Sequence, residues 1–186
     1  MRKAIFLDRD GVLNIEVNYL HRPEDVILIP GTAEALRMIH AAGFLAVVVS
    51  NQSGVARGMY GMADVKAVET RICELLKQQG TEVPDAFYYC PHHQKGVVRE
   101  LSFDCECRKP KPGMFLKAMS DWQIDPAQSY MIGDRISDLQ AGKAAGCAGG
   151  VLVLTGYGAQ CAEQARTEGW PVKPAVPDAV EYILKK

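Results

Sequence analysis

Two carboxylates stand two positions apart directly after an apolar run, in Asp8-x-Asp10-Gly11 behind Ala4–Leu7. Such a pair can divide the work of phosphoryl transfer, because one carboxylate can attack phosphorus while the other acts as general acid and base. Gly11 allows the chain to turn sharply behind them. A solvated turn has a similar composition, so this motif taken alone leaves both interpretations open.

Two more polar residues stand at the ends of apolar runs far along the chain. Ser50 closes a valine-rich run, and Asp134 follows the run Tyr130–Ile132. In a parallel sheet the carboxyl ends of the strands meet at one edge, where ligands bind, so we expect these residues and Asp8 to converge. Asp134 and Asp138 can instead merely begin the next helix, but a second acid at a strand end favours a site for Mg²⁺, which prefers oxygen ligands.

A cluster of cysteine and histidine begins at Cys90 and continues within segment 91–112, in which neither helical nor strand period holds. Three thiolates and one imidazole suit a closed, structural Zn²⁺ site, which would staple this irregular segment. The cysteine pairs can alternatively oxidise or pack as small apolar residues, and His93 is a rival for the histidine position. The expected ligands are Cys90, His92, Cys105 and Cys107.

The remaining cysteines and histidines carry no motif. Cys73 falls on the apolar face of a predicted helix, so we expect it in the core, while Cys147 and Cys161 have no evident partner. His21 and His40 are expected to be ordinary surface or helix-end residues.

Alternating apolar runs and helical periods predict an α/β fold, a three-layer Rossmann-like parallel sheet with helices on both faces. The expected strands are Ala4–Leu7, Phe44–Ser50, Ala86–Tyr89, Tyr130–Ile132 and Val151–Leu154. The expected helices lie between Gly31 and Gly43, over 64–79, 114–122 and 136–145, and around 179–183. Asp64 is expected to cap the second helix, and the last thirty residues to form the sheet edge and a closing helix.

The composition is that of one globular domain. The 186 residues carry 21 Lys and Arg against 22 Asp and Glu, and the net charge of −1 argues against a broad nucleic-acid-binding surface. The longest apolar stretch, Phe44–Val49, is far shorter than the roughly 18 residues of a membrane span, and Asp8 comes too early for a secretory signal. We therefore expect a cytoplasmic monomer that binds neither nucleic acid nor membrane, in a reducing compartment that favours metal binding by cysteine.

Four ordered motifs resemble those of the haloacid dehalogenase superfamily phosphatases. They are Leu7–Gly11, Ser50–Gly54, Arg108–Pro110 and Ile132–Asp134, and they span most of the chain. Three further segments are similar to the branch of this superfamily that acts on heptose bisphosphates, namely Asn51–Gly58, Tyr89–His93 and Cys105–Pro110. Two positions depart from the pattern, Ser50 where threonine is common and Arg135 where lysine is common, but both keep the functional group.

The resemblance implies roles for the residues at the strand ends. Asp8 would attack phosphorus to give an aspartyl phosphate, and Asp10 would protonate the leaving alkoxide and then deprotonate water. Ser50 and Lys109 would donate hydrogen bonds to phosphoryl oxygens, although a lysine here can also be a solvated loop residue. Mg²⁺ would be held by Asp8, the main-chain carbonyl of Asp10, and Asp134. The resemblance also favours His92 over His93 as the zinc ligand.

The implied substrate is a small sugar bisphosphate, a heptose 1,7-bisphosphate that loses its 7-phosphate in the biosynthesis of nucleotide-activated heptoses. The candidate substrate-binding residues are Glu16, Tyr19, Asn51, Gln52, Ser53, Arg57, Arg108 and Arg135. The three arginines suit a second phosphate, although they can also be merely solvated. No segment between the motifs is long enough for a separate cap domain, so we expect one domain over 1–186 with a zinc loop at 90–112.

Two other functions compete with this interpretation. A histidinol-phosphate phosphatase has similar acidic motifs and a similar zinc loop, but its cationic substrate favours acidic loops rather than arginines. A noncatalytic zinc-stapled interaction module would not require Asp8, Asp10, Lys109 and Asp134 together, since a binding scaffold has no need of paired acids and a metal carboxylate.

Overall fold

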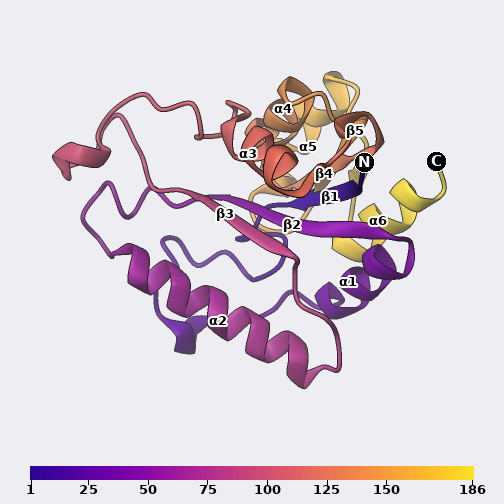
Figure 1. The fold of residues 1–186 in the computed structure, drawn as a ribbon, viewed down its shortest axis with the longest axis horizontal. Helices are drawn as coiled ribbons and strands as arrows, with labels where there is room; N and C mark the ends of the chain where they lie inside the picture. Colours follow the sequence, from indigo (N-terminus) through magenta and orange to yellow (C-terminus); the bar gives the residue numbers. More distant parts are fainter.

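Six parallel strands form a single sheet in the computed structural model, which describes residues 1–186 (Figure 1). The spatial order is β3-β2-β1-β4-β5-β6. The chain begins in the middle of the sheet, builds one half outward, and then returns to build the other half from β4. The strands are β1 (Lys3–Leu7), β2 (Phe44–Asn51), β3 (Ala86–Cys90), β4 (Tyr130–Gly133), β5 (Gly149–Val153) and β6 (Val172–Lys173).

Six helices cover the two faces of the sheet. Helices α1 (Thr32–Ala41), α2 (Met62–Gln78) and α6 (Val176–Leu184) supply residues to one buried apolar cluster. Helices α3 (Gly113–Trp122), α4 (Ile136–Ala144) and α5 (Gly158–Thr167) supply residues to the other. Figure 1 shows these two layers on opposite sides of the sheet. The predicted α/β parallel sheet with helices on both faces is therefore confirmed.

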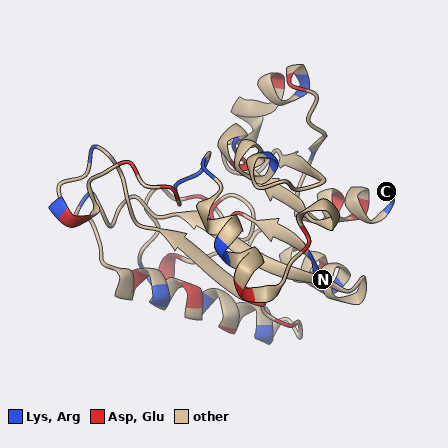
Figure 2. Cartoon of the chain, turned by 45° about the horizontal axis from the view of Figure 1, so that its top comes forward, with Lys and Arg blue, Asp and Glu red and all other residues tan.

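The four central strands, β1, β2, β4 and β5, are continuous buried runs because both of their faces are covered. In β1, Ile5 and Leu7 pack into one cluster, while Ala4 and Phe6 pack into the other, and all four are fully buried. The outer face of α2 is polar instead, with both signs of charge along it (Figure 2) and ion pairs such as Lys66–Glu69. That face is solvated.

Three local predictions need correction. Helix α5 was not expected, because its buried side chains are only Ala162 and Ala165, which give a weak apolar period. Asp64 lies at the third position of α2 rather than at its cap: Gly61 is the cap residue, and its N–H donates to Asp64 Oδ2 at 2.8 Å. Cys73 is half-buried and belongs to neither core cluster, since Ile72 and its neighbours one turn away fill the inner face of the helix.

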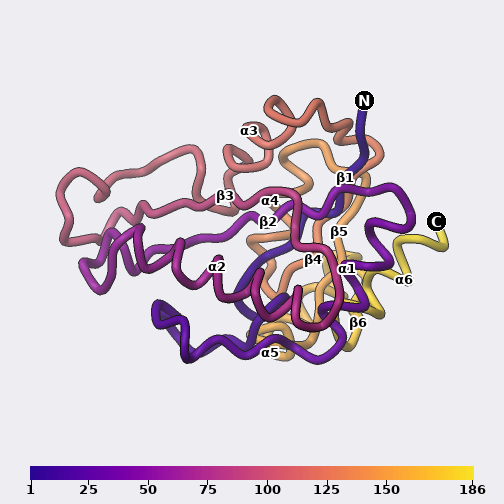
Figure 3. Tube along the Cα trace, turned by 60° about the horizontal axis from the view of Figure 1, so that its bottom comes forward, coloured from indigo at the N-terminus to yellow at the C-terminus, as the bar shows by residue number.

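Two loops project together beyond the carboxyl edge of the sheet (Figure 3). One follows β2, and the other is the long connection from β3 to α3, whose only regular element is a single 3₁₀ turn at Arg99–Leu101. The backbone carbonyl of Ala56 in the first loop accepts from Val97 N and Val98 N in the second. The pair therefore forms one wall beside the strand ends. None of the helices has both the length and the apolar character that crossing a membrane requires.

Candidate active site

A polar cavity of about 450 Å³ opens at the carboxyl ends of β1, β2 and β4. Asp8, Asp10 and Ser50 line it, as the position of the strand ends predicts, and Lys109 from segment 91–112 lines it as well. Every candidate substrate-binding residue also lines it: Glu16, Tyr19, Asn51, Gln52, Ser53, Arg57, Arg108 and Arg135. Asp134 is only 1% exposed and lies beneath the cavity wall. The structure thus brings together residues that are up to 127 positions apart, from Asp8 to Arg135.

Lys109 is a buried ammonium at the base of this cavity, not a solvated loop residue. Its Nζ lies 3.0 Å from Asp8 Oδ1 and 2.8 Å from Asp138 Oδ1, and it donates to the carbonyl of Val49 at 2.8 Å. Burial lowers the pKa of Lys109, but the carboxylates of Asp138 and Asp8 outweigh that effect and raise it to about 12. The lysine therefore stays charged while it is held between the two acids.

Asp8 presents one free oxygen to the cavity. Its Oδ1 lies against Lys109 Nζ and accepts the N–H of Arg9 at 2.8 Å. No protein donor bonds to its Oδ2, so that oxygen is left for a ligand. Burial raises the pKa of Asp8, Lys109 lowers it, and the carboxylates of Asp138 and Asp10 raise it further.

Three buried carboxylates form a group that fits a divalent cation. One oxygen from each of Asp8, Asp134 and Asp138 lies within 4.8 Å of the others. Burial raises the pKa of Asp134, and the neighbouring Asp8 and Asp138 raise it further, which is the mark of negative charge without enough compensation. Asp134 Oδ1 is moreover buried without any hydrogen-bond partner. A hard cation with oxygen ligands would satisfy that atom and balance the excess charge.

Two glycines let the chain approach Asp134 closely. The carboxylate oxygen Oδ2 accepts the backbone N–H of Tyr157 at 2.8 Å. A Cβ atom on either Gly11 or Gly156 would collide with the same oxygen, and both glycines have a positive φ. The DxDG turn after β1 and the turn after β5 therefore pack on Asp134 from both sides, which fixes its orientation.

Asp138 does more than begin its helix. Its Oδ2 accepts the backbone N–H of Arg135 at 2.9 Å, as an acid in the first turn commonly does, while its Oδ1 pairs with Lys109. Gly133 leaves room for it, because a Cβ there would collide with the Asp138 side chain. The sequence signal was an acid one turn after a strand-end acid, but helix capping explained it equally well.

The carboxylate of Asp10 is held by three side chains. Arg9 contacts both of its oxygens, with Nη2 3.0 Å from Oδ2 and Nε 3.2 Å from Oδ1. Asn14 donates to Oδ1 at 2.9 Å, and Gln52 donates to Oδ2 at 3.0 Å. Arg9 is fully buried, which its type did not suggest, since arginine is rarely buried unless it is paired. Its partner is the neighbouring acid of the motif.

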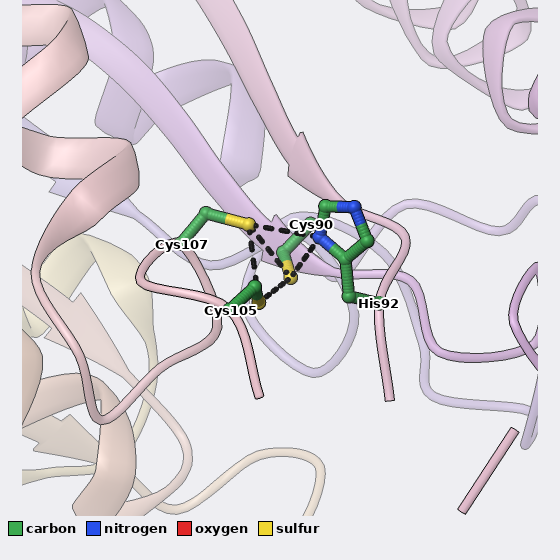
Figure 4. A group of neighbouring side chains, drawn as sticks. All are labelled: Cys90, His92, Cys105 and Cys107. Atoms are coloured by element: carbon green, nitrogen blue, oxygen red, sulfur yellow. Dashed lines mark hydrogen bonds between the residues drawn. The ribbon is translucent and has the colours of Figure 1, made fainter. Parts of the chain in front are cut away.

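The predicted zinc ligands converge at the end of β3 (Figure 4). Cys107 Sγ lies 3.1 Å from Cys90 Sγ and 3.4 Å from Cys105 Sγ, and His92 Nδ1 lies 3.2 Å from Cys107 Sγ. Zn–S bonds of about 2.3 Å place tetrahedral ligands roughly 3.8 Å apart, so these atoms would have to move apart by less than about 1 Å to form such a site. All six cysteines of the chain are free thiols. The donor set therefore fits zinc.

His93 lies beside Arg57 in the cavity and not in the cysteine cluster. Its Nε2 lies 3.2 Å from Arg57 Nη2, and its Nδ1 accepts the backbone N–H of Lys95 at 3.0 Å. It lines the cavity together with Arg57 and Arg108, so the geometry favours His92 as the ligand. His21 and His40 lie outside the cysteine cluster, the first stacked on Tyr60 and the second paired with Asp85.

The cysteine cluster is tied to the cavity through its last ligand. Cys107 precedes Arg108 and Lys109, and Asn51 clamps Lys109 with its amide, accepting from Lys109 N at 3.1 Å and donating to Lys109 O at 3.2 Å. Asn51 thus joins the end of β2 to this loop, while its predicted contact with substrate stays a prediction. Arg135 is exposed and lies over the ring of Tyr157 at 3.7 Å from its centroid.

Several known proteins with similar sequences and folds are phosphatases. A family model described as HAD-hydrolase-like matches residues 106–181. The D-glycero-β-D-manno-heptose-1,7-bisphosphate 7-phosphatase of Pasteurella multocida is 46% identical over 156 residues, 84% of each chain. Its counterpart from Escherichia coli O6:H1 is 40% identical over 97% of this chain and 88% of its own. A crystal structure of D,D-heptose 1,7-bisphosphate phosphatase from B. bronchiseptica, complexed with magnesium and phosphate, is 34% identical, with a TM-score of 0.85 and coverage of 100% and 99%.

Proposed function

Because the chain belongs to the family of heptose-1,7-bisphosphate 7-phosphatases, within the haloacid dehalogenase-like hydrolases, we propose that it removes the 7-phosphate of D-glycero-D-manno-heptose 1,7-bisphosphate. The chain is a phosphoric monoester hydrolase. The observation that carries the substrate proposal is the division of one cavity between a buried Asp8–Lys109 pair and a separate group of cationic donors, Arg57 and Arg108. The first end would perform the reaction, and the second would bind the phosphate that is retained.

The reacting phosphate would lie against Asp8. Its free Oδ2 attacks phosphorus, the bond from phosphorus to the sugar oxygen breaks, and an aspartyl phosphate forms. Lys109 and Ser50 donate to the phosphoryl oxygens as negative charge develops there. Lys109 reaches that position already charged and held between two acids, so it needs little reorganisation.

Asp10 would move the protons. It gives a proton to the leaving sugar oxygen and then accepts one from the water that hydrolyses the aspartyl phosphate, which regenerates Asp8 and releases inorganic phosphate. Its present contacts with Arg9, Asn14 and Gln52 suit the ionised carboxylate, the form required in the second step.

Magnesium would be held by Asp8, Asp134 and the main-chain carbonyl of Asp10. When bound, it supplies positive charge that offsets the charge on the transferring group. The unpartnered Asp134 Oδ1 and its closeness to the Asp8 carboxylate support the assignment of these two acids. Zinc would be bound by Cys90, His92, Cys105 and Cys107 in a structural role, with no ligand position open for water.

The retained phosphate would bind where two donors now face each other. Because His93 Nδ1 accepts from Lys95 N, the proton of the neutral ring lies on Nε2, which faces the Arg57 guanidinium at 3.2 Å. Both groups are donors, so neither satisfies the other, and Arg57 Nε is buried without a partner. A phosphate oxygen between them would accept from both. This arrangement favours a bisphosphate over histidinol phosphate, whose free end is cationic.

The decisive experiment compares substrates. Inorganic phosphate release is measured in parallel with both anomers of the heptose bisphosphate and with histidinol phosphate, and ³¹P NMR identifies the phosphate that remains on the sugar. We expect the highest kcat/KM with a heptose bisphosphate, leaving the phosphate at position 1. Faster turnover of histidinol phosphate, or loss of the 1-phosphate, would overturn the proposal.

A further inference from the structure

Tyr60 reaches the catalytic residues although no motif includes it. Its hydroxyl donates to Oε1 of Gln52 at 3.0 Å, and Gln52 is only 2% exposed. Gly54 makes room for this contact, since a Cβ at that position would collide with the Tyr60 ring. The ring of His21 stacks on the Tyr60 ring, with centroids 5.3 Å apart and planes inclined by 4°. The phenol is therefore held in one place.

The amide of Gln52 joins two residues of the proposed mechanism. Its Nε2 donates to Asp10 Oδ2 at 3.0 Å and to Ser50 Oγ at 2.9 Å. An amide nitrogen has two hydrogens, so both are used, and the bond from Tyr60 occupies Oε1. The side chain is thus bonded at both ends and links Tyr60, Asp10 and Ser50.

The orientation of this amide decides what Ser50 can do. While Ser50 Oγ accepts from Gln52, its own O–H remains free to donate to a phosphoryl oxygen. If the amide were reversed, Gln52 Oε1 would face the Asp10 carboxylate and would also compete for the Ser50 proton. Two oxygens with no hydrogen between them repel, so the reversed state loses the bond to Asp10 and ties up the Ser50 hydroxyl. The Asp10 carboxylate, which can only accept, sets the orientation of the amide, and the Tyr60 hydroxyl anchors its opposite end by donating to Oε1.

We propose that Tyr60 is a positioning residue that acts through Gln52, fixing the amide so that Asp10 stays in place and the Ser50 hydroxyl is free for the transferring phosphate. This inference rests on the proposed roles of Asp10 and Ser50. Burial raises the pKa of Tyr60 to about 12, so its hydroxyl keeps the proton that it donates at neutral pH.

The first test is Tyr60→Phe, which removes one oxygen and keeps the ring. We expect kcat to fall by about 2- to 10-fold, the effect of one hydrogen bond, while KM for the bisphosphate changes by less than about twofold. The loss in kcat/KM should be larger for the sugar phosphate than for an aryl phosphate, whose better leaving group depends less on the proton from Asp10. Tyr88→Phe is the matched control, because its hydroxyl donates to Asp121 at 2.8 Å on the surface, away from the cavity.

A double-mutant cycle with Gln52→Ala separates positioning from other roles. If Tyr60 acts through Gln52, Tyr60→Phe adds no further loss once Gln52 is alanine. Additive losses, a raised KM with unchanged kcat, or equal losses on the sugar and aryl phosphates would each overturn the inference, since each would mean that Tyr60 contacts substrate or only supports the fold. The cycle can be measured on any phosphate monoester that the wild-type protein hydrolyses. Failure of the heptose substrate with the wild-type protein would therefore refute the proposed function and leave this test intact.

Discussion

The acidic group and the cysteine cluster lie at the same edge of the sheet but are built by different parts of the chain. Asp8 and Asp134 follow β1 and β4 directly, and Asp138 stands in the first turn of α4. Only Cys90 of the other cluster belongs to a strand, and its partners come from segment 91–112, where Cys105 and Lys109 are the only buried residues. The sheet can therefore hold the acids by itself, whereas the long loop has little packing of its own.

This difference indicates that the cysteine cluster, and not the acidic group, depends on its ion for structure. The acids are partly balanced by the buried Lys109, so their arrangement is supported by protein contacts before any cation binds. The loop lacks such support, so zinc binding would contribute directly to its folding. We expect loss of the first ion to stop the reaction without unfolding the protein, and loss of the second to loosen a loop and slow the reaction indirectly.

The largest effect should come from Asp8→Asn, in the acidic group that the sheet positions. An amide is neither a nucleophile toward phosphorus nor a carboxylate ligand, so turnover should fall by about 10⁴-fold or more. Circular dichroism should show an intact fold, and Asp121→Asn on the surface should keep full activity. Appreciable turnover by the folded variant would contradict the nucleophile assignment.

Asp138→Asn should have the next largest effect. It removes the negative charge that holds Lys109, while the asparagine side chain has nearly the same shape as aspartate. The amide oxygen can still accept from Arg135 N, so α4 should begin normally. Lys109 loses one of its two charged partners, and we expect a loss of about 10- to 100-fold in kcat, as for other residues that orient an active-site group. Steady-state kinetics and thermal melting check this. A large fall in melting temperature with unchanged kcat would make Asp138 a structural residue only.

Arg57→Ala tests the other end of the cavity. It removes one of the two donors that face each other, so KM for the heptose bisphosphate should rise by about 10-fold or more while kcat changes little. An aryl monophosphate has no second phosphate and should show no change in KM. An equal increase for both substrates would show that Arg57 does not recognise the retained phosphate.

The smallest effect should come from Cys107→Ser, in the cysteine cluster that the long loop builds. Elemental analysis should show reduced zinc, and hydrogen exchange should show faster exchange over 91–112 while the central sheet stays protected. Because Arg108 and Lys109 follow this ligand, kcat should fall by about 10-fold.

A chelator experiment sharpens the same contrast. After mild chelation, added Mg²⁺ should restore activity without displacing zinc, since thiolates prefer the softer ion and Mg²⁺ prefers oxygen. Reduced, active wild-type protein that contains no zinc would remove the structural role assigned to this cluster.

The sequence by itself was enough to predict which residues converge at the strand ends and which side chains could share a metal ion. Asp8, Ser50 and Asp134 converge because parallel strands bring their carboxyl ends to one edge, whatever residues lie between them. Cys90, Cys105 and Cys107 meet as their spacing and donor chemistry predict, with His92, which the family resemblance favoured over His93. The apolar runs of β1 and β2 also identified strands covered on both faces, because only such strands are apolar without alternation.

Only the tertiary structure decided which polar side chains meet inside that framework. The burial of Arg9 against Asp10, the second bond of Asp138 to Lys109, and the contact of Tyr60 with Gln52 each depend on where a side chain points after the loops have packed. Residue type argued against the first, and helix capping concealed the second. The third joins two ends of the loop between β2 and α2, and no motif includes Tyr60. Local sequence reports the direction of the backbone and the balance of polarity, whereas such contacts are settled by packing and by the need of each buried polar group for a partner.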